Sequence, residues 1–483
     1  MDKPSEKYLP TIGLEIHAEL KTVSKMFCSC PNNPDEERPN VNVCAICLGH
    51  PGTLPVLNKA AIKSVLKIGL AVDGTLADFT EWDRKNYFYP DIPKGYQISQ
   101  YAYPLISGGT LAGIKLERIH LEEDTASSTH DAHEKSLVNF NRSGVPLMEL
   151  VTTPTIHDAK TATNFAKELQ LLLRYLGAGE ANLEKGEMRV EANISVATPE
   201  DTATKKFGTK TEVKNLNSFR AVEGAIAYEI ERQIALLEAG EKVKQETRGW
   251  DEKAGETYSQ RSKESSHDYR YFPDPDIPKL KISEMPEFSK TALTKELVEL
   301  PWVRRERFKK DFGATDKETE MFVDDFDGTL TKYFETVVAK LSNKETKNVR
   351  LVLNYLLTDY LGLLKKNGGA LETIKPEYFA ELIDMISAGD VSSSGAKKIL
   401  TLLLTEKESP KALADKNGLI QKSDVASLEP AIDKVISDNA AVVAEYHAGK
   451  VTSIQFLIGQ AMKATKGAAN PAVIKELLVK KLV

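Results

Sequence analysis

The sequence has few cysteines, no long apolar run and neither of two common nucleotide-binding motifs. Its 483 residues include four cysteines, and no apolar stretch reaches the roughly 18 residues that a membrane span needs. No Gly-x-x-x-x-Gly-Lys loop and no Gly-x-Gly-x-x-Gly follows a predicted strand, which excludes a P-loop and a Rossmann nucleotide site. Residues 1–7 contain no signal-peptide core, so we expect a cytoplasmic protein with no membrane partner.

A global positive charge is also absent. The net charge is −6, and the contents of 41% hydrophobic and 28% charged residues are ordinary for a globular protein. A nucleic-acid partner would therefore have to be held by local basic patches. The length exceeds what one hydrophobic core supports and predicts about three domains.

The cysteines lie in one short window, at Cys28, Cys30, Cys44 and Cys47. In a cytosolic chain, Cys-x-Cys followed by Cys-x-x-Cys indicates a metal site rather than disulfides. Four thiolates can bind zinc tetrahedrally, and they leave no open position for a substrate. We therefore predict a structural zinc site, and the alternative is a loop of four reduced cysteines without metal.

Four segments show the period-two alternation of strands with one polar face: residues 11–20, 118–124, 187–196 and 210–214. Their polar faces present side chains that bind divalent cations: Glu15, His17, Glu122, Glu191 and Glu212. If the strands share one sheet, like charges converge, which is destabilising without a cation. The pattern predicts a magnesium-dependent phosphoryl-transfer site with lysines nearby. The alternative is the ordinary wet face of a half-buried sheet.

The position of Glu123 is left open by the alternation. Because Ile119 and Leu121 face the core, strict alternation places Glu122 on the polar face and Glu123 inward. A bulge at the strand end could bring Glu123 to the site instead.

Residues 207–240 predict a strand that leads into a helix. Asn217 or Ser218 is the expected N-cap, and Gly240 the expected end. An apolar stripe is expected at Phe219, Val222, Ile226, Ile230, Ile234 and Leu237. The helix N-terminus favours anions such as phosphate, although a solvated strand before an ordinary helix is the simpler interpretation.

Residues 81–101 combine six aromatic side chains with charged ones, including Lys85 and Lys94. Two prolines and a glycine interrupt the segment, which suits a loop that binds phosphates and a flat base. A loop that packs under the sheet is an equally good interpretation.

From about residue 291 helical periodicity replaces strand alternation, with helices predicted over 349–365, 376–388, 396–404 and 453–463. The last part is rich in bases that suit a phosphate backbone: Lys450, Lys463, Lys466, Lys475, Lys480 and Lys481. We predict an α+β protein with a mostly antiparallel, β-rich cradle (1–292), an all-α domain (293–406) and a small α-helical tail (407–483).

Six segments go beyond these patterns: Gly13-Leu-Glu-Ile-His-Ala-Glu-Leu-Lys-Thr, Phe88-Tyr-Pro-Asp-Ile-Pro-Lys-Gly-Tyr-Gln-Ile-Ser, His120-Leu-Glu-Glu-Asp, Lys214-Asn-Leu-Asn-Ser-Phe, Asp268-Tyr-Arg-Tyr-Phe-Pro-Asp-Pro-Asp and Gly459-Gln-Ala-Met-Lys-Ala-Thr-Lys-Gly. In this order, along nearly the whole chain, they resemble the B subunits of tRNA-dependent amidotransferases. Several motifs of this length are far more specific than any single spacing.

The resemblance implies a ligase that forms carbon–nitrogen bonds with glutamine as amido donor. The B subunit would work in a heterotrimer with an amidase A subunit and a small C subunit. It would use ATP and magnesium to phosphorylate the side-chain carboxylate of misacylated Glu-tRNA(Gln), Asp-tRNA(Asn) or both. Ammonia from the A subunit would then displace the phosphate, and the tail would help to grip the tRNA.

The resemblance also implies roles for individual residues. The magnesium site would be formed by Glu15, His17, Glu123, Glu191 and Glu212, with Glu122 as a candidate beside Glu123. Lys85 and Lys94 would face the phosphates and act in catalysis with Glu123 and Glu212, and Lys214 would help to bind the nucleotide. The four cysteines resemble a zinc knuckle that only some members have.

Two positions depart from the family pattern. Glu191 stands where an aspartate is expected, and Thr125-Ala-Ser-Ser follows Asp124 where a Gly-Lys pair is expected. Lys210 or Lys214 could replace the missing lysine. These departures leave a non-catalytic tRNA-binding scaffold as the alternative function. A metal-dependent hydrolase fits less well, because no nucleophile–base pair is evident.

Overall fold

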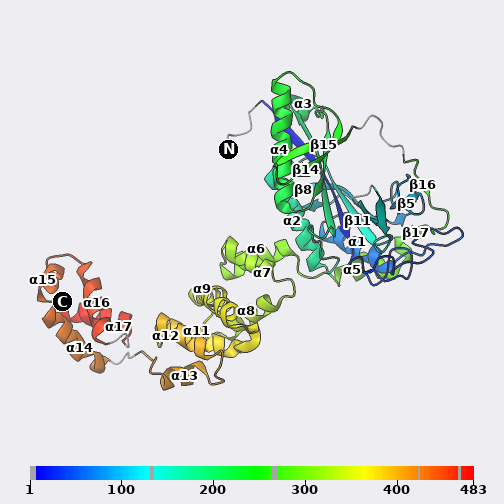
Figure 1. Cartoon of the computed structure of the whole chain (residues 1–483). Coiled ribbons are helices and arrows are strands. Elements are labelled where there is room, and N and C mark those ends of the chain that lie inside the picture. The colour runs from blue at the N-terminus through cyan, green and yellow to red at the C-terminus, as the bar shows by residue number, and fades with distance from the viewer. Residues whose placement is uncertain (1–6, 131–134, 263–268, 422–424, 466–468, 483) are drawn as a thin grey trace. The chain divides into compact units, whose positions relative to one another are not determined.

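The computed structural model of the chain describes residues 7–130, 135–262, 269–421, 425–465 and 469–482. It divides into two compact units, Met1–Pro301 and Trp302–Val483 (Figure 1). The described β-strands all lie in the first unit, and the second unit is helical. The predicted α+β class is confirmed.

The first unit is built around one ten-stranded sheet. The strand order is β15 (Glu256–Ser262), β14 (Glu246–Asp251), β13 (Thr211–Leu216), β12 (Met188–Ala197), β1 (Leu9–Glu19), β11 (Pro146–Thr152), β8 (Ile114–Glu123), β6 (Ile106–Ser107) and β2 (Thr75–Leu76), and β7 (Thr110–Leu111) pairs with β8. The described pairs are antiparallel except for β13 and β14, which are parallel. The mostly antiparallel sheet is therefore as predicted.

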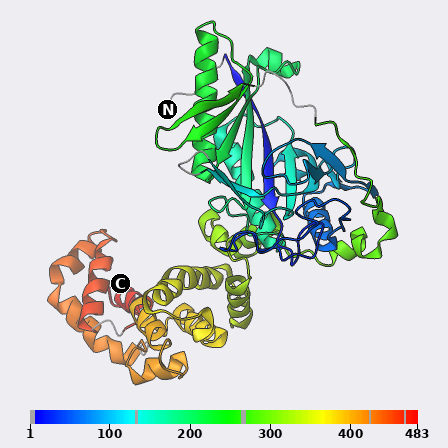
Figure 2. The same ribbon diagram turned by 45° about the vertical axis from the view of Figure 1, so that its right-hand side comes forward.

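The central strands have one apolar and one polar face, as their alternation predicts. On β1, Ile12, Leu14 and Ile16 are at most 1% exposed. The helices α2 (Ala159–Tyr175) and α4 (Phe219–Glu238) lie side by side against the sheet (Figures 1 and 2). Because neighbouring side chains on a strand alternate, Glu15 and His17 project from the face opposite the apolar one.

Helix α4 differs from its prediction in the face that it buries. Ser218 is the N-cap and accepts a hydrogen bond from the Ala221 backbone, as predicted. The buried positions of its second half, however, are Glu229 and Gln233, whereas the predicted Ile230, Ile234 and Leu237 are only half-buried. The expected stripe is wrong there because Glu229 is held by Arg232, Gln233, Arg248 and Thr257.

Part of the segment 81–101 is a β-hairpin rather than a loop. β4 (Asp83–Asn86) pairs with β5 (Tyr96–Ser99) and with β16 (Phe272–Pro273) in a three-stranded sheet. The connection between β4 and β5 exposes Phe88 and Tyr89.

The remaining elements of the first unit are short or peripheral. They are α1 (Lys59–Ala71), β3 (Phe79–Thr80), β9 (Ser127–His130), β10 (Ser136–Asn139), α3 (Pro199–Ala203), β17 (Leu280–Lys281), two 3₁₀ turns (Ile282–Glu284 and Pro286–Phe288) and α5 (Lys290–Thr294).

The second unit contains two separate hydrophobic clusters, one within residues 308–414 and one within 428–482. Its helices are α6 (Pro301–Phe312), α7 (Asp316–Val323), α8 (Thr329–Lys340), α9 (Thr346–Asn354), α10 (Leu361–Asn367), α11 (Pro376–Ala388), α12 (Ser393–Leu402), α13 (Pro410–Lys416), α14 (Val425–Asp438), α15 (Ala440–His447), α16 (Ser453–Ala464) and α17 (Pro471–Leu482). A π-helical segment, Tyr355–Tyr360, interrupts the helix predicted over 349–365. The domain boundaries at 292/293 and 406/407 stay predictions. None of the described helices has the length and apolarity to cross a membrane.

Candidate active site

The register of four central strands places four polar side chains in one row across the sheet. His17 on β1 lies opposite Arg189 on β12 and opposite Glu149 on β11. Glu149 lies opposite His120 on β8. Residues that face each other across antiparallel strands point to the same side of the sheet, so the row brings two imidazoles to one carboxylate.

Glu149 is at the centre of this cluster. Its Oε2 lies 3.3 Å from Nε2 of His17 and 3.3 Å from Nε2 of His120. Glu122 completes the other side, with its oxygens 3.6 Å from His17 Nε2 and 3.7 Å from His120 Nε2. Glu15 Oε1 lies 3.9 Å from His17 Nε2. We call Glu15, His17, His120, Glu122 and Glu149 the carboxylate–imidazole cluster.

The charged groups of the cluster shift one another's pKa values. Burial by itself would raise the pKa of Glu149, but His120 and His17 hold that pKa well below its usual range. Burial would lower the pKa of His120, yet Glu149 and Glu122 raise it to about 9. The pKa of Glu15 is raised, by burial first and then by Glu149. The neighbouring carboxylates raise the pKa of both imidazoles, and a divalent cation could balance the same carboxylates instead.

The donor set fits a divalent cation. Two groups of ligand atoms each lie within 4.8 Å of one another: Glu15, His17 and Glu149, and His120, Glu122 and Glu149. Carboxylate oxygens suit magnesium and manganese, and imidazole nitrogens suit transition metals. Glu15 is the most exposed of these side chains, at 33%, so the cluster is accessible from its side.

Lys85 lies next to the cluster on β4. Burial would lower the pKa of this lysine, but Glu122, Tyr271 and Glu149 raise it. Its Nζ lies 4.9 Å from the centre of the Tyr269 ring. A cation is therefore held beside the carboxylates, where it could face a phosphate.

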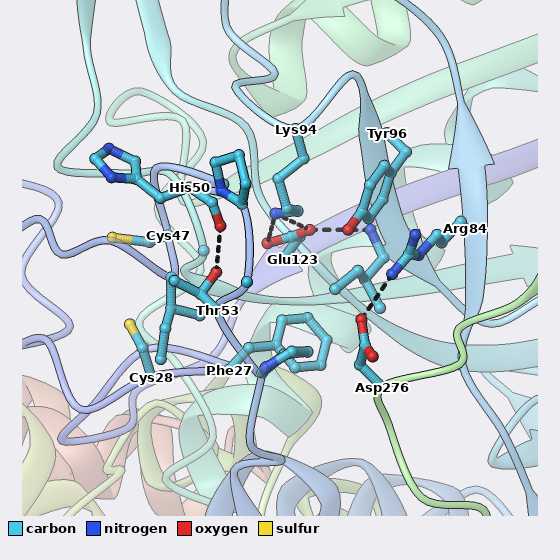
Figure 3. A pocket seen from close by; sticks show the side chains of 17 residues that line it. Phe27, Cys28, Cys47, His50, Thr53, Arg84, Lys94, Tyr96, Glu123 and Asp276 are labelled. Atoms are coloured by element: carbon cyan, nitrogen blue, oxygen red, sulfur yellow. Dashed lines mark hydrogen bonds and ion pairs between the residues drawn. The ribbon is translucent and has the colours of Figure 1, made fainter.

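The structure places Glu123 and Lys94 elsewhere. Glu123 points away from the cluster, where its carboxylate lies 2.6 Å from Lys94 Nζ and accepts a hydrogen bond from the Ile98 backbone. Both residues line a cavity of about 250 Å³ beside Cys28 and Cys47, which Figure 3 shows. Of the two glutamates that the sequence could not separate, Glu122 is the one beside His17.

Glu191 and Glu212 form a separate group with Lys214 on the neighbouring strands. Lys214 Nζ lies 2.7 Å from Glu191 and 3.8 Å from Glu212. Thr247 also donates a hydrogen bond to Glu212. Glu191 lies opposite Glu15 in the register, so this group borders the cluster, but its carboxylates are engaged by a lysine.

The four cysteines come together as their spacing predicts, with ligand atoms within 4.8 Å of one another. All four are free thiols. The pKa of Cys47 is lowered to about 5, first by Cys28 and further by its other neighbours, among them Lys25. Four thiols gathered this closely fit the tetrahedral thiolate site of zinc.

Two arginines from other strands and loops lie near the segment after Asp124, where a Gly-Lys pair is expected. Arg142 donates hydrogen bonds to the carbonyls of Thr125 and Ala126, and Arg189 lies 2.7 Å from buried Asp124. Positive charge is therefore present at this end of the site without a lysine at 126 or 127.

Sequence reasoning missed Glu149 and His120. Glu149 is a lone charge in the apolar run Leu147 to Val151, and an unpaired charge there would be costly to bury. This cost was the feature of the sequence that could have indicated a buried partner for Glu149. His120 belongs to a quoted motif, but its partner Glu149 became visible only with the pairing of β8 and β11.

The fold and the cluster together define a class of protein: an α+β chain that presents a carboxylate–imidazole site on a broad antiparallel sheet. The profile of the family described as GatB/GatE catalytic domain matches residues 10–286, and that of the GatB domain matches 332–482. Named relatives match along nearly the whole chain. The B subunit of the aspartyl/glutamyl-tRNA(Asn/Gln) amidotransferase of Thermodesulfovibrio yellowstonii is 43% identical over 98% of this chain and 99% of its own. Proteins of the same name from a Picosynechococcus species and from Myxococcus xanthus are 40% and 41% identical over 99% of this chain, and over 98% and 99% of their own.

The chain therefore belongs to the B-subunit family of tRNA-dependent amidotransferases, as its motifs predicted. Membership favours the ligase over the non-catalytic scaffold.

Proposed function

We propose that this chain is the ATP-using subunit that activates the amino acid on a misacylated tRNA. The side-chain carboxylate of tRNA-linked glutamate or aspartate attacks the γ-phosphorus of ATP, and ADP leaves. Ammonia then attacks the carbonyl carbon of the acyl phosphate, inorganic phosphate leaves, and the amide is formed. An amidase A subunit would release the ammonia from glutamine, and a small C subunit would complete a cytoplasmic heterotrimer.

The convergence of Glu15, His17, Glu122 and Glu149 is the observation that supports this proposal most directly. Donor atoms separated by 3.3–3.9 Å have the spacing of neighbouring ligands around one small cation. Bound there, magnesium would neutralise the charge on the transferred phosphoryl group. In this proposal Glu122 replaces Glu123 among the ligands, and Glu191 and Glu212 act beside the cluster by holding Lys214.

Lys85 and Arg189, which lie beside the cluster, would have different roles in the reaction. Lys85 is held among Glu122 and Glu149 and would stabilise charge on the phosphoryl oxygens. Arg189, one-third exposed and anchored by Asp124, would orient the incoming carboxylate. Lys94 and Glu123 lie on the other side of β8, so their role would be apart from the phosphoryl transfer.

Structural zinc at the four cysteines is the second part of the proposal. Zinc bound by the four thiolates would cross-link the two ends of the loop 28–47. The four cysteines are free thiols, so no disulfide does this in the described structure. Zinc there would contribute folding free energy rather than chemistry.

Phosphate release by the chain assembled with its amidase and small partner subunits tests the activity. Labelled ATP and magnesium are supplied with Glu-tRNA(Gln), Asp-tRNA(Asn), either uncharged tRNA or no RNA. We expect release that requires a charged tRNA and is lost in Glu149→Gln, whereas Glu117→Gln, an exposed glutamate on the same sheet, retains it. Tight tRNA binding without stimulated release would favour the scaffold.

A further inference from the structure

Strand β13 contains a β-bulge close to the end that leads into α4. Ala192 on β12 lies opposite Val213 on β13. Val190, two residues away on β12, lies opposite Leu216, which is three residues away on β13. One extra residue of β13 is therefore accommodated between these two pairs. Asn215 lies in this interval with a φ of 63°, a left-handed conformation that is uncommon outside glycine and is enriched for asparagine.

The bulge allows two side chains of β13 to occupy opposite faces of the sheet. Lys214 lies on the polar face beside Glu191, and Leu216 is only 2% exposed, in the core. In a regular strand, residues two positions apart point to the same face. A shift of register by one residue would not separate them either, because it moves every side chain of the strand to the other face. The extra residue permits both placements.

Asn215 acts on the strand through its backbone. Its side chain is exposed, whereas its left-handed conformation is part of the bulge. Glycine adopts this conformation without a steric penalty, and a β-branched residue adopts it only as a rare outlier. The residue type at position 215 therefore determines how easily β13 can form the bulge.

Lys214 is the charged side chain whose position depends on the bulge. Its Nζ lies 2.7 Å from Glu191 Oε2 and 3.8 Å from Glu212 Oε1. Glu212 has a second support, because Thr247 on β14 donates a hydrogen bond of 2.8 Å to its Oε2. Glu191 lies opposite Glu15 of the carboxylate–imidazole cluster. Lys214 thus holds a positive charge at the edge of the cluster, where it would stabilise charge on a phosphoryl group.

We propose that Asn215 is a positioning residue of the reaction and acts through Lys214. Its left-handed conformation forms the bulge that directs the lysine to the two carboxylates. The inference rests on the proposed function, because that function gives Lys214 its role. The motif Lys214-Asn-Leu-Asn-Ser-Phe then contains a charged side chain, the residue that positions it and the N-cap of α4.

The reactivity of the Lys214 amine reports its position without any substrate. The assembled complex is treated with formaldehyde and a borane reductant, and the methylation of each lysine is followed by mass spectrometry. In Asn215→Val we expect Lys214 to react as fast as the exposed Lys210, because its restraining ion pairs are lost. Asn215→Gly should keep the slower wild-type reaction. Ala112→Val places the same side chain at another exposed left-handed position and should leave the reactivity of Lys214 unchanged.

Phosphate release stimulated by charged tRNA shows whether this position matters to the reaction. Lys214→Met and Asn215→Val should each lower kcat by roughly 100-fold, the size of one lost group that stabilises developing charge. Asn215→Gly and Ala112→Val should retain kcat. The double variant of Lys214→Met and Asn215→Val should be no slower than Lys214→Met alone, because residues that act through one another are not additive.

Asn215→Ala keeps the test decisive if Asn215→Val does not assemble. Alanine strains the left-handed conformation less than valine does. We therefore expect its kcat and its Lys214 reactivity to lie between those of Asn215→Gly and Asn215→Val, and wild-type values of both in Asn215→Ala and Asn215→Val would contradict the proposal.

Three other results would overturn the proposal. They are equal losses of kcat in Asn215→Gly and Asn215→Val, additive losses in the double variant, and wild-type kcat in Asn215→Val although Lys214 has become reactive. Failure of the proposed function looks different. Phosphate release by the wild type would then be independent of charged tRNA, while the methylation of Lys214 would still follow the residue at position 215.

Discussion

At the scale of single residues, the site depends on Glu149. It is buried in an apolar strand, and removing one partner of a buried charge pair leaves a costly unpaired charge. Both imidazoles contact the same oxygen of this carboxylate, so Glu149 connects the ligands of β1 with those of β8.

Glu149→Gln should weaken the binding of a divalent cation by roughly 100-fold or more, because even the loss of an outer-shell partner costs 10–100-fold. Manganese titration followed by electron paramagnetic resonance measures the affinity. Glu117→Gln is the control on the same sheet. Unchanged manganese affinity in Glu149→Gln would place the cation elsewhere.

The four clustered cysteines lead to a prediction about the metal content of the chain. The purified chain should hold one zinc per molecule by elemental analysis, and Cys44→Ser should lose it together with thermal stability. Manganese binding at Glu149 should persist in this variant, since the cysteines lie apart from the carboxylate–imidazole cluster. Wild-type chain that contains no zinc after expression in zinc-supplemented medium would contradict the prediction.

At the scale of elements, one ion pair connects α7 and α9. Glu318 is in the N-terminal capping box of α7, and its carboxylate lies 2.7 Å from the Arg350 guanidinium on α9. Arg350 first, and then the Thr315 bonds, lower the pKa of Glu318 to about 2. A carboxylate whose pKa is depressed on folding stabilises the fold above its unfolded pKa and loses that contribution as the pH falls toward the folded value.

Glu318→Gln should therefore lower the free energy of unfolding by about 1–2 kcal/mol at pH 7, allowing for solvent screening. The deficit should shrink between about pH 4.5 and pH 2, because the wild type loses the same interaction there. Urea unfolding of the full chain at pH 7 and pH 3 checks both points. Glu320→Gln, which removes a more exposed pair on the same helix, should cost less, and an equal cost at both pH values for Glu318→Gln would disprove the linkage.

Elements were predictable where the pattern is local. The faces of β1 and β12, the N-cap Ser218 and the helix Pro376–Ala388 all follow from short-range alternation, capping and periodicity. The place of β11 between β1 and β8 does not, because the pairing of distant strands is not encoded in any one segment. For that reason His17 and Glu122 were expected at the site and Glu149 was not. The buried face of α4 was misjudged because Glu229 finds partners from outside the helix, Arg248 and Thr257.

At the scale of the whole molecule, the carboxylate–imidazole cluster and the basic surface lie in different units. The carboxylate–imidazole cluster belongs to the first unit, and five of the predicted tail lysines are exposed in the second: Lys450, Lys463, Lys475, Lys480 and Lys481. Lys450 and Lys481 pair with Glu445 and Asp433, and Lys466 lies outside the described residues.

Lys463→Met with Lys475→Met should therefore weaken tRNA binding and reduce the salt dependence of the binding constant by about 0.9 for each phosphate that the tail no longer neutralises. ATP affinity should remain unchanged. Filter binding at several salt concentrations measures the slope, and an unaltered slope would show that the tail does not touch the phosphates. Lys411→Met with Lys407→Met offers a control of equal charge change in the same unit.

The central claim is that the substrate carboxylate, not water, attacks ATP. It is tested by charging tRNA(Gln) with glutamate, and tRNA(Asn) with aspartate, that carry ¹⁸O in the side-chain carboxylate, and by analysing the phosphate after turnover by the assembled complex. Transfer of one ¹⁸O atom to each phosphate released is the predicted result, with the loss of that transfer in Glu149→Gln. Phosphate without ¹⁸O, formed while amide accumulates, would show that ATP is hydrolysed by water and would contradict the claim.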